Sequence, residues 1–145
     1  METVGDTTVE KKIKGRKRTI AVDTQGFLHH VQASAANEND SVLGCEMVEV
    51  IADKCPTVVS ICADAGYRGV MEDFAKYVYD ITVQIVQKLG GGFHVLPKRW
   101  IVERTLAWIS KARRLVKDYE VNPIRSENMV RIAMLRVTLK QLAIS

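Results

Sequence analysis

Residues 58–69 read VVSICADAGYRG, an almost uninterrupted apolar run followed by an aspartate and a turn. Such a run is typical of a strand buried on both faces of a sheet. Asp64 closes it, and the carboxyl ends of strands in α/β sheets face the ligand crevice. Asp64 is therefore a candidate site residue, although an aspartate that only starts the turn before Gly66 has the same local sequence.

The segments upstream of this strand predict a hairpin and a helix. Residues 19–22 and 27–32 are short strand-like runs separated by DTQG at 23–26, a turn composition. Residues 39–41 (Asn-Asp-Ser) offer N-cap candidates for a helix of about 14 residues that ends before Pro56.

The downstream half is mostly helical by pattern. Residues 70–79 have helical spacing, 81–87 alternate as in a strand, and three glycines at 90–92 mark a loop. Two further helices are predicted over 99–118 and, after a break at Asn122-Pro123, from about Ser126 to Leu142. Strands mixed with helices in this order predict an α/β domain.

The composition fits one compact domain. The chain has 145 residues, 47% of them hydrophobic, and a net charge of +4, which excludes a disordered polycation and an acidic tail protein. No apolar run approaches the ~20 residues of a membrane span. The opening residues lack the apolar core of a secretory signal, so we expect a cytoplasmic protein with no membrane partner.

The cysteines and histidines show no metal-ligand spacing and no C-x-x-C pair, so we expect no zinc site and interpret the cysteines as small core residues. These residues are Cys45, Cys55, Cys62, His29, His30 and His94.

Charge is distributed unevenly along the chain. Residues 1–18, 19–97 and 98–145 carry net charges of +3, −6 and +7. Six of the eight residues 11–18 are basic, a run that contacts phosphate or forms a solvated arm. On the helix predicted from residue 99, Glu103 lies opposite the apolar arc, among cationic residues. Glu103 either neutralises these cationic neighbours or binds a metal ion on a surface that binds phosphates.

Three ordered motifs resemble the DDE-type transposases of bacterial insertion sequences. They are KGRKRTIAVDT at 14–24, ADAGYRG at 63–69 and LPKRWIVERTLAW at 96–108, and the resemblance extends over roughly residues 11–143. It implies a ribonuclease H-like mixed sheet with flanking helices. It also implies an enzyme in which two Asp and one Glu hold two Mg²⁺ ions, with Mn²⁺ as a substitute, to cleave DNA and join a 3′-hydroxyl to target DNA.

The resemblance assigns Asp64 and Glu103 as catalytic metal ligands and makes DNA, both element ends and target, the partner. Arg99 matches a family arginine near the active site. Two positions depart from the family pattern: Leu96 replaces a tyrosine, and Ser110, which is followed by Lys111, replaces a lysine. The basic residues expected to contact phosphate are Lys14, Arg16, Lys17, Arg18, Arg68, Lys98, Arg99 and Arg104. Tyr67 and Trp100 fit either base stacking or the core.

The first aspartate of the family has no clear counterpart. It normally lies on a strand upstream of the basic run, and only about ten residues precede that run here. The central strand and its Asp are absent in one interpretation, which makes the chain a fragment, a pseudogene product or a frameshift product. Alternatively Asp6, whose flanks are not strand-like, or Asp23, which starts a hairpin turn, takes the role.

These alternatives set the expectations for domains and activity. We expect a flexible lead-in at 1–12 and a partial catalytic domain at 13–145 that lacks its first, central strand. A sheet without that strand would have unpaired inner edges, so we expect marginal stability or self-association, or assembly with an upstream transposase polypeptide, unless residues 1–12 supply a substitute strand. A DNA-binding remnant without catalysis and a ribonuclease H-like nuclease are the competing functions.

Overall fold

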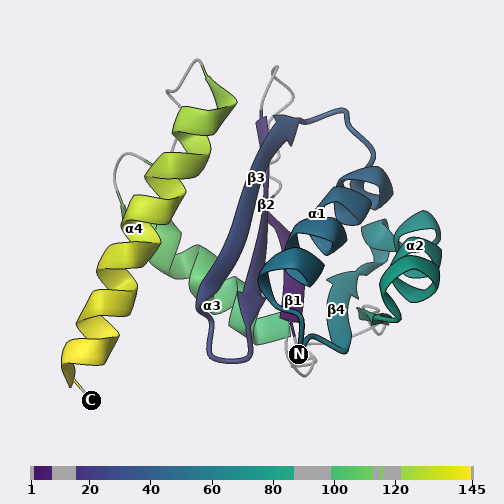
Figure 1. Ribbon diagram of the computed structural model, residues 1–145. Helices are drawn as coiled ribbons and strands as arrows, with labels where there is room; N and C mark the ends of the chain where they lie inside the picture. Colours follow the sequence, from purple (N-terminus) through teal and green to yellow (C-terminus); the bar gives the residue numbers. More distant parts are fainter. Residues whose placement is uncertain (1, 8–15, 87–98, 113–114, 116–121, 145) are drawn as a thin grey trace, which may run out of the picture.

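The computed structural model describes residues 2–7, 16–86, 99–112, 115 and 122–144, with side chains from residue 16 onward except those of Arg99 and Trp100. One five-stranded sheet has the order β3-β2-β1-β4-β5 (Figure 1). The strands are β1 (Glu2–Thr7), β2 (Arg16–Asp23), β3 (Leu28–Ala35), β4 (Ser60–Asp64) and β5 (Thr82–Val86). The helices are α1 (Asp40–Lys54), the 3-10 turn η1 (Ala65–Tyr67), α2 (Val70–Tyr79), α3 (Arg99–Ser110) and α4 (Pro123–Ile144).

The prediction that the central strand is missing is wrong. Glu2–Thr7 forms β1, which pairs antiparallel with β2 and parallel with β4. Residues 2–7 of the expected lead-in are therefore part of the sheet, while 8–15 lie outside the described residues. A strand of six residues with neighbours on both sides satisfies its backbone groups through pairing, so it needs little apolar pattern of its own. With β1 in place, the argument for unpaired inner edges no longer holds.

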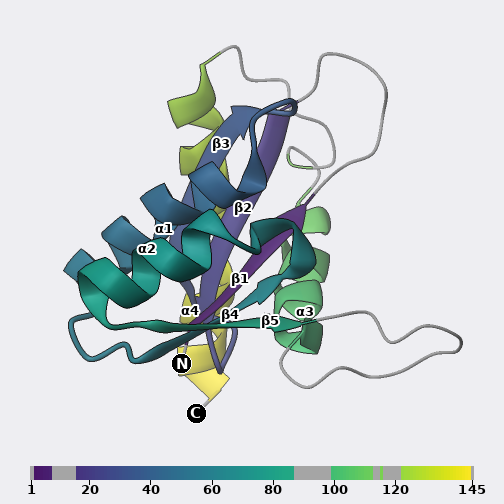
Figure 2. The same ribbon diagram turned by 90° about the vertical axis from the view of Figure 1, so that its right-hand side faces the viewer.

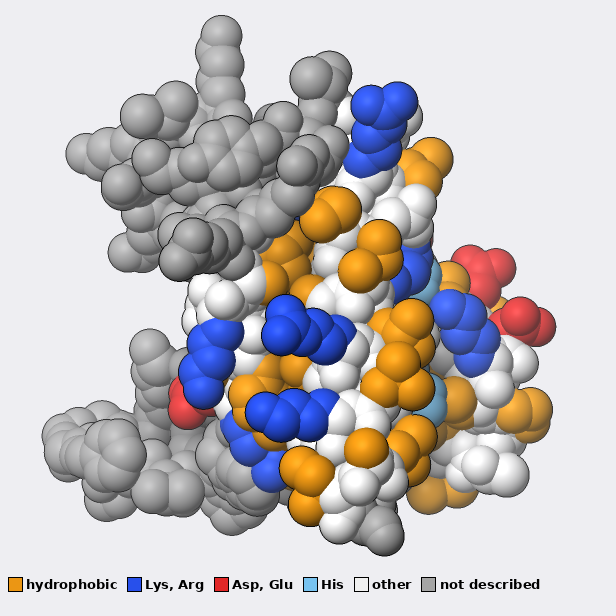
Figure 3. Space-filling view, turned by 90° about the vertical axis from the view of Figure 1, so that its left-hand side faces the viewer, with side chains coloured by type: hydrophobic (Ala, Val, Ile, Leu, Met, Phe, Trp, Pro, Cys, Tyr) orange, Lys and Arg blue, Asp and Glu red, His pale blue; other side chains and the backbone are white. Residues whose placement is uncertain are grey.

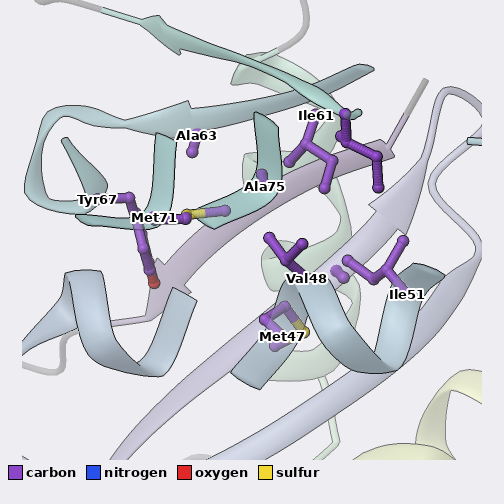
Figure 4. Close-up of a cluster of buried hydrophobic side chains, with 10 residues drawn as sticks. Met47, Val48, Ile51, Ile61, Ala63, Tyr67, Met71 and Ala75 are labelled. Atoms are coloured by element: carbon purple, nitrogen blue, oxygen red, sulfur yellow. The ribbon is translucent and has the colours of Figure 1, made fainter. Parts of the chain in front are cut away.

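Two helical layers enclose the sheet. Helices α1 and α2 cover one face, and α3 and α4 cover the other (Figures 1 and 2). Successive residues of β2 serve both layers, because Ala21 packs with the α1 and α2 cluster whereas Ile20 and Val22 pack with α3 and α4. The first cluster includes Met47, Val48, Ile51, Ile61, Ala63, Tyr67, Met71 and Ala75 (Figure 4).

Helix boundaries follow local capping chemistry. Asn39 caps α1 by accepting a hydrogen bond from the Ser41 N–H at 2.9 Å, as the N-cap candidates predicted. Helix α4 begins at Pro123 rather than near Ser126, because proline fits the first helical turn and Asn122 Oδ1 accepts from the Ile124 N–H. Helix α3 ends at Ser110, earlier than predicted.

The outward face of α4 carries both exposed apolar and basic side chains (Figure 3). Ile132, Leu135, Leu139 and Leu142 recur at helical spacing and are each at least 58% exposed. Among the described helices, none combines the length and hydropathy needed to cross a bilayer.

Candidate active site

Asp64 lies at the carboxyl end of β4, as the sequence predicts. Its side chain is half-buried, and its backbone pairs with Val86 of β5 before the chain enters η1. A strand between two neighbours has little freedom, so the position of Asp64 is set by the sheet. The turn that follows also exists, so Asp64 both ends a strand and begins a turn.

Asp6 lies near the carboxyl end of the adjacent strand. In the parallel pair of β1 and β4, Val4 is opposite Ala63, so Asp64 is one residue and Asp6 two residues beyond this pair. The two aspartates thus differ by one step of about 3.3 Å along the strand direction. The backbones of two aspartates that are far apart in the sequence therefore lie near the carboxyl ends of neighbouring strands, just beyond the last residue pair of β1 and β4.

Helix α3, which contains Glu103, lies on the sheet face opposite α1 and α2 (Figure 2). It contacts β1 and β2. Its buried residues include Ile101, Thr105 and Ile109, whereas Glu103 is exposed. The helix therefore presents an apolar side to the sheet and Glu103 away from that side, as the 100° periodicity predicts.

A partly buried ion pair lies next to the Asp64 turn. The Lys17 ammonium pairs with the Asp40 carboxylate and also donates to the Glu38 carbonyl at 3.0 Å, and the Lys17 side chain is 7% exposed. A Cβ on Gly66 would lie 2.8 Å from Asp40 Oδ2, so Asp40 packs directly against the backbone of this glycine. Sequence reasoning missed this contact, because β2 and the start of α1 meet η1 only in the folded chain.

The donor set at this edge consists of carboxylates, the hard oxygen ligands that Mg²⁺ prefers. Across the side chains that the structure describes, which exclude that of Asp6, no group of three His, Cys, Asp or Glu residues is placed to hold a metal ion. The backbone supplies two adjacent aspartates, and Glu103 lies on the helix that contacts β1. The residue types fit a magnesium site, but the two residues after Glu103, Arg104 and Thr105, contact the hairpin turn at the opposite end of β1, so the described contacts do not bring Glu103 to the aspartate edge.

The predicted DNA-binding residues have different surroundings. Arg18 donates to the Leu115 carbonyl at 3.0 Å and to Ser126 Oγ at 3.2 Å, and Arg104 donates to the Gln25 carbonyl and stacks on Trp108 at 4.7 Å. Arg68 is exposed directly after η1, and Arg16 is half-buried. Lys14 and Lys98 lie outside the described residues, as does the side chain of Arg99 at the start of α3.

Arg18 and Lys17 therefore have internal partners in the fold. Lys17 joins β2 to α1, and Arg18 joins β2 to α4. Their phosphate contacts remain predictions without support from these surroundings.

Asp23 does not reach the aspartate edge. It pairs with Glu2 at the opposite end of β1, four residues from Asp6. Its Oδ1 accepts hydrogen bonds from the N–H groups of Gln25 at 2.8 Å and Phe27 at 3.0 Å, so it shapes the hairpin turn. Asp23 is thereby excluded as the first aspartate of the site.

Three other expectations concern the core. Tyr67 is 1% exposed and belongs to the core rather than to a stacking surface, while the side chain of Trp100 lies outside the described residues. Cys62 is buried, as predicted, whereas Cys45 and Cys55 are only half-buried.

Comparisons with known proteins agree with this arrangement. A family model described as "Transposase DDE domain" matches residues 3–138. The catalytic core domain of BIV integrase is 20% identical, with a TM-score of 0.55, over 92% of this chain and 80% of that one. A chain of the simian T-cell lymphotropic virus intasome in complex with PP2A regulatory subunit B56 gamma is 16% identical, with a TM-score of 0.60, over 92% of this chain and 46% of that one.

The search of curated proteins gives no match. The likeness to integrase catalytic cores confirms the predicted ribonuclease H-like fold. The family model covers most of the chain and includes β1 from Thr3 onward and the ends of β4 and α3. The chain therefore belongs to the transposase DDE domain family.

Proposed function

We propose that this domain carries out Mg²⁺-dependent DNA cleavage and strand transfer for an insertion sequence, with Asp6, Asp64 and Glu103 as the metal ligands. The observation that supports the proposal is the parallel pairing of β1 with β4, because both strands run toward the same end of the sheet and each has an aspartate just beyond the last residue pair, Val4 and Ala63. The assignment of Asp6 is supported by the strand β1, for which the sequence pattern had no clear counterpart.

Each of the three proposed carboxylate ligands comes from a different strand or helix. The two aspartates come from neighbouring central strands, and Glu103 comes from a helix packed on the sheet, so their backbones are fixed independently of any ligand. When bound, two Mg²⁺ ions activate the attacking oxygen and stabilise the leaving oxygen of a phosphodiester. The carboxylates would hold these ions, and nearby cations would hold the DNA backbone.

The proposed DNA contacts are made by basic residues, of which Arg68 and Arg16 are described near the aspartate edge. Arg68 follows η1 directly and is exposed, so it is the described arginine best placed beside Asp64. Arg16 begins β2, whose antiparallel direction brings its start to the same end of the sheet. Lys14, Lys98, Arg99 and Arg104 complete the proposed contacts, which give affinity without base specificity.

The first test is nicking of supercoiled plasmid by the purified chain in Mg²⁺ or Mn²⁺. Asp6→Asn, Asp64→Asn and Glu103→Gln each remove one negative charge and nearly preserve shape, and each should reduce nicking by at least about 100-fold, since the ions lose a ligand. Asp80→Asn is the matched control. Asp80 is a surface residue at the αL cap of α2, before the opposite end of β5, and Asn tolerates this conformation.

The outcomes separate the candidate functions. Full nicking by Asp6→Asn would contradict the assignment of Asp6. Salt-sensitive DNA binding by all variants without metal-dependent nicking by the wild type would instead identify a DNA-binding remnant. Nicking without joining of 3′-hydroxyl ends to a second DNA would indicate a nuclease. The proposed function also includes a cytoplasmic location and the assembly of several copies of the protein on DNA.

A further inference from the structure

A second cluster of reactive side chains lies at the other end of the sheet. His29 Nδ1 is 3.2 Å from Cys55 Sγ, and His29 Nε2 is 3.5 Å from Asp23 Oδ2. The three residues come from the start of β3, the C-cap of α1 and the end of β2. A nucleophile within reach of a base, with a third group orienting the base, is the arrangement of an activated nucleophile.

The contacts define which ring nitrogen carries the proton. A carboxylate accepts hydrogen bonds only, so the contact with Asp23 favours the proton on His29 Nε2. Nδ1 then carries a lone pair that faces the Cys55 thiol at 3.2 Å. The thiol proton can pass to Nδ1, and the Asp23 carboxylate stabilises the resulting imidazolium.

Asp23 is held firmly in this orientation. Its Oδ1 accepts hydrogen bonds from two turn N–H groups, those of Gln25 and Phe27, which leaves Oδ2 directed at the imidazole. The hairpin turn therefore serves as the support for His29.

Some of the other nearby charged and polar groups favour the thiolate form of Cys55, and others disfavour it. Lys54 Nζ lies 3.4 Å from the His29 carbonyl and 3.4 Å from His30 Nδ1, and its positive charge favours a thiolate. The carbonyl end of α1 disfavours one. Burial beside Lys54 and Arg131 lowers the pKa of His30 to about 4, so His30 adds no positive charge at neutral pH, and Glu127 acts on His30 in the opposite sense.

We propose that Cys55 is a nucleophilic thiol, activated by His29 and Asp23, and that it is a modification site for small electrophiles of the peroxide class. In the reaction the Cys55 sulfur attacks one peroxide oxygen, an S–O bond forms and the O–O bond breaks. The sulfur is oxidised by two electrons to sulfenic acid, and the leaving oxygen, reduced, takes the proton from His29 and departs as water or an alcohol. This site is separate from the aspartate edge and does not depend on the proposed function.

The other two cysteines provide internal controls. The Cys45 thiol donates to the Ser41 carbonyl at 3.3 Å, and burial raises its pKa, so it stays protonated. Cys62 is 2% exposed and out of reach of reagents. Cys55 is half-buried and accessible.

The test is alkylation of the folded wild-type chain by iodoacetamide, followed peptide by peptide with mass spectrometry. At pH 6.5 Cys55 should react at least about 10-fold faster than Cys45, and its rate should change little up to pH 8, since the reactive form is already present. Hydrogen peroxide followed by dimedone should label Cys55 and neither of the other cysteines.

Two variants identify the cause. His29→Gln removes the base, and Asp23→Asn removes the charge while its amide oxygen can still accept from the turn, so each should slow Cys55 alkylation at pH 6.5 by about 10-fold. Circular dichroism checks that both variants fold. A wild-type rate at Cys55 that rises tenfold per pH unit from 6.5, or an unchanged rate in folded His29→Gln, would overturn the proposal.

Discussion

At the scale of single residues, the Lys17 and Asp40 pair has the clearest energetic consequence. Lys17→Met leaves the Glu38 carbonyl and the Asp40 carboxylate without their ammonium partner. The Asp40 side chain is 29% exposed, so water compensates in part, and we expect a loss of about 1–3 kcal/mol in unfolding free energy. Urea denaturation of Lys17→Met, Asp40→Asn and the double variant measures the coupling; single losses that simply add would contradict a direct interaction.

Residue-level prediction from sequence worked where the signal was local. Asp64 ends a strand and Glu103 lies on the exposed side of α3, as their neighbours in the sequence predict. Lys17 shows the limit. Its place in a basic run predicts a phosphate contact, but its partner is 23 residues away and comes close only when β2 lies beside α1.

At the scale of elements, the contact between α1 and α2 depends on a missing side chain. A Cβ on Gly44 would lie 2.5 Å from Met71 Sδ and 2.9 Å from Tyr67 Cδ1, both in the core. Alanine in place of a helical glycine normally stabilises by about 1 kcal/mol. Here we expect Gly44→Ala to destabilise by about 1–3 kcal/mol, because the core is already filled. Thermal unfolding measures the sign, and a raised melting temperature would contradict the close packing.

The double variant Gly44→Ala with Met71→Ala provides the control. Truncation of Met71 opens the space that the new methyl group needs. The double variant should therefore lose less unfolding free energy than the sum of the losses in the two single variants.

Element prediction succeeded for segments with a strong pattern and failed for β1. The α1 cap, the hairpin and α2 each carry a local signal, and their observed bounds agree with it to within a few residues. The signal for β1 was only its β-branched residues, Thr3, Val4 and Thr7. Its stability as a strand comes from β2 and β4 on either side, and single-sequence patterns do not contain that information.

At the scale of the whole molecule, His30 links stability to pH. Burial, then the charges of Lys54 and Arg131, lower its pKa from 6.5 to about 4. The unfolded chain therefore binds more protons between these values, and stability is full above pH 6.5 and declines as the pH falls to about 4. Since the ring is partly exposed, we expect this residue to account for about 1–2 kcal/mol.

Urea denaturation at pH 7 and pH 4.5 measures this effect, with His30→Gln as the reference. The variant should lose less unfolding free energy between the two pH values than the wild type. Equal losses would show that other groups cause the acid sensitivity.

The position of β1 between β2 and β4 has a consequence for the order of folding. The contact with β2 closes over a short loop, but the parallel contact with β4 joins residues almost sixty positions apart, such as Glu2 and Ile61. Contacts of this range carry a large closure entropy and form late. A nascent chain can thus complete its hairpins well before Asp6 meets Asp64, so the acidic edge takes shape only in molecules whose sheet has closed.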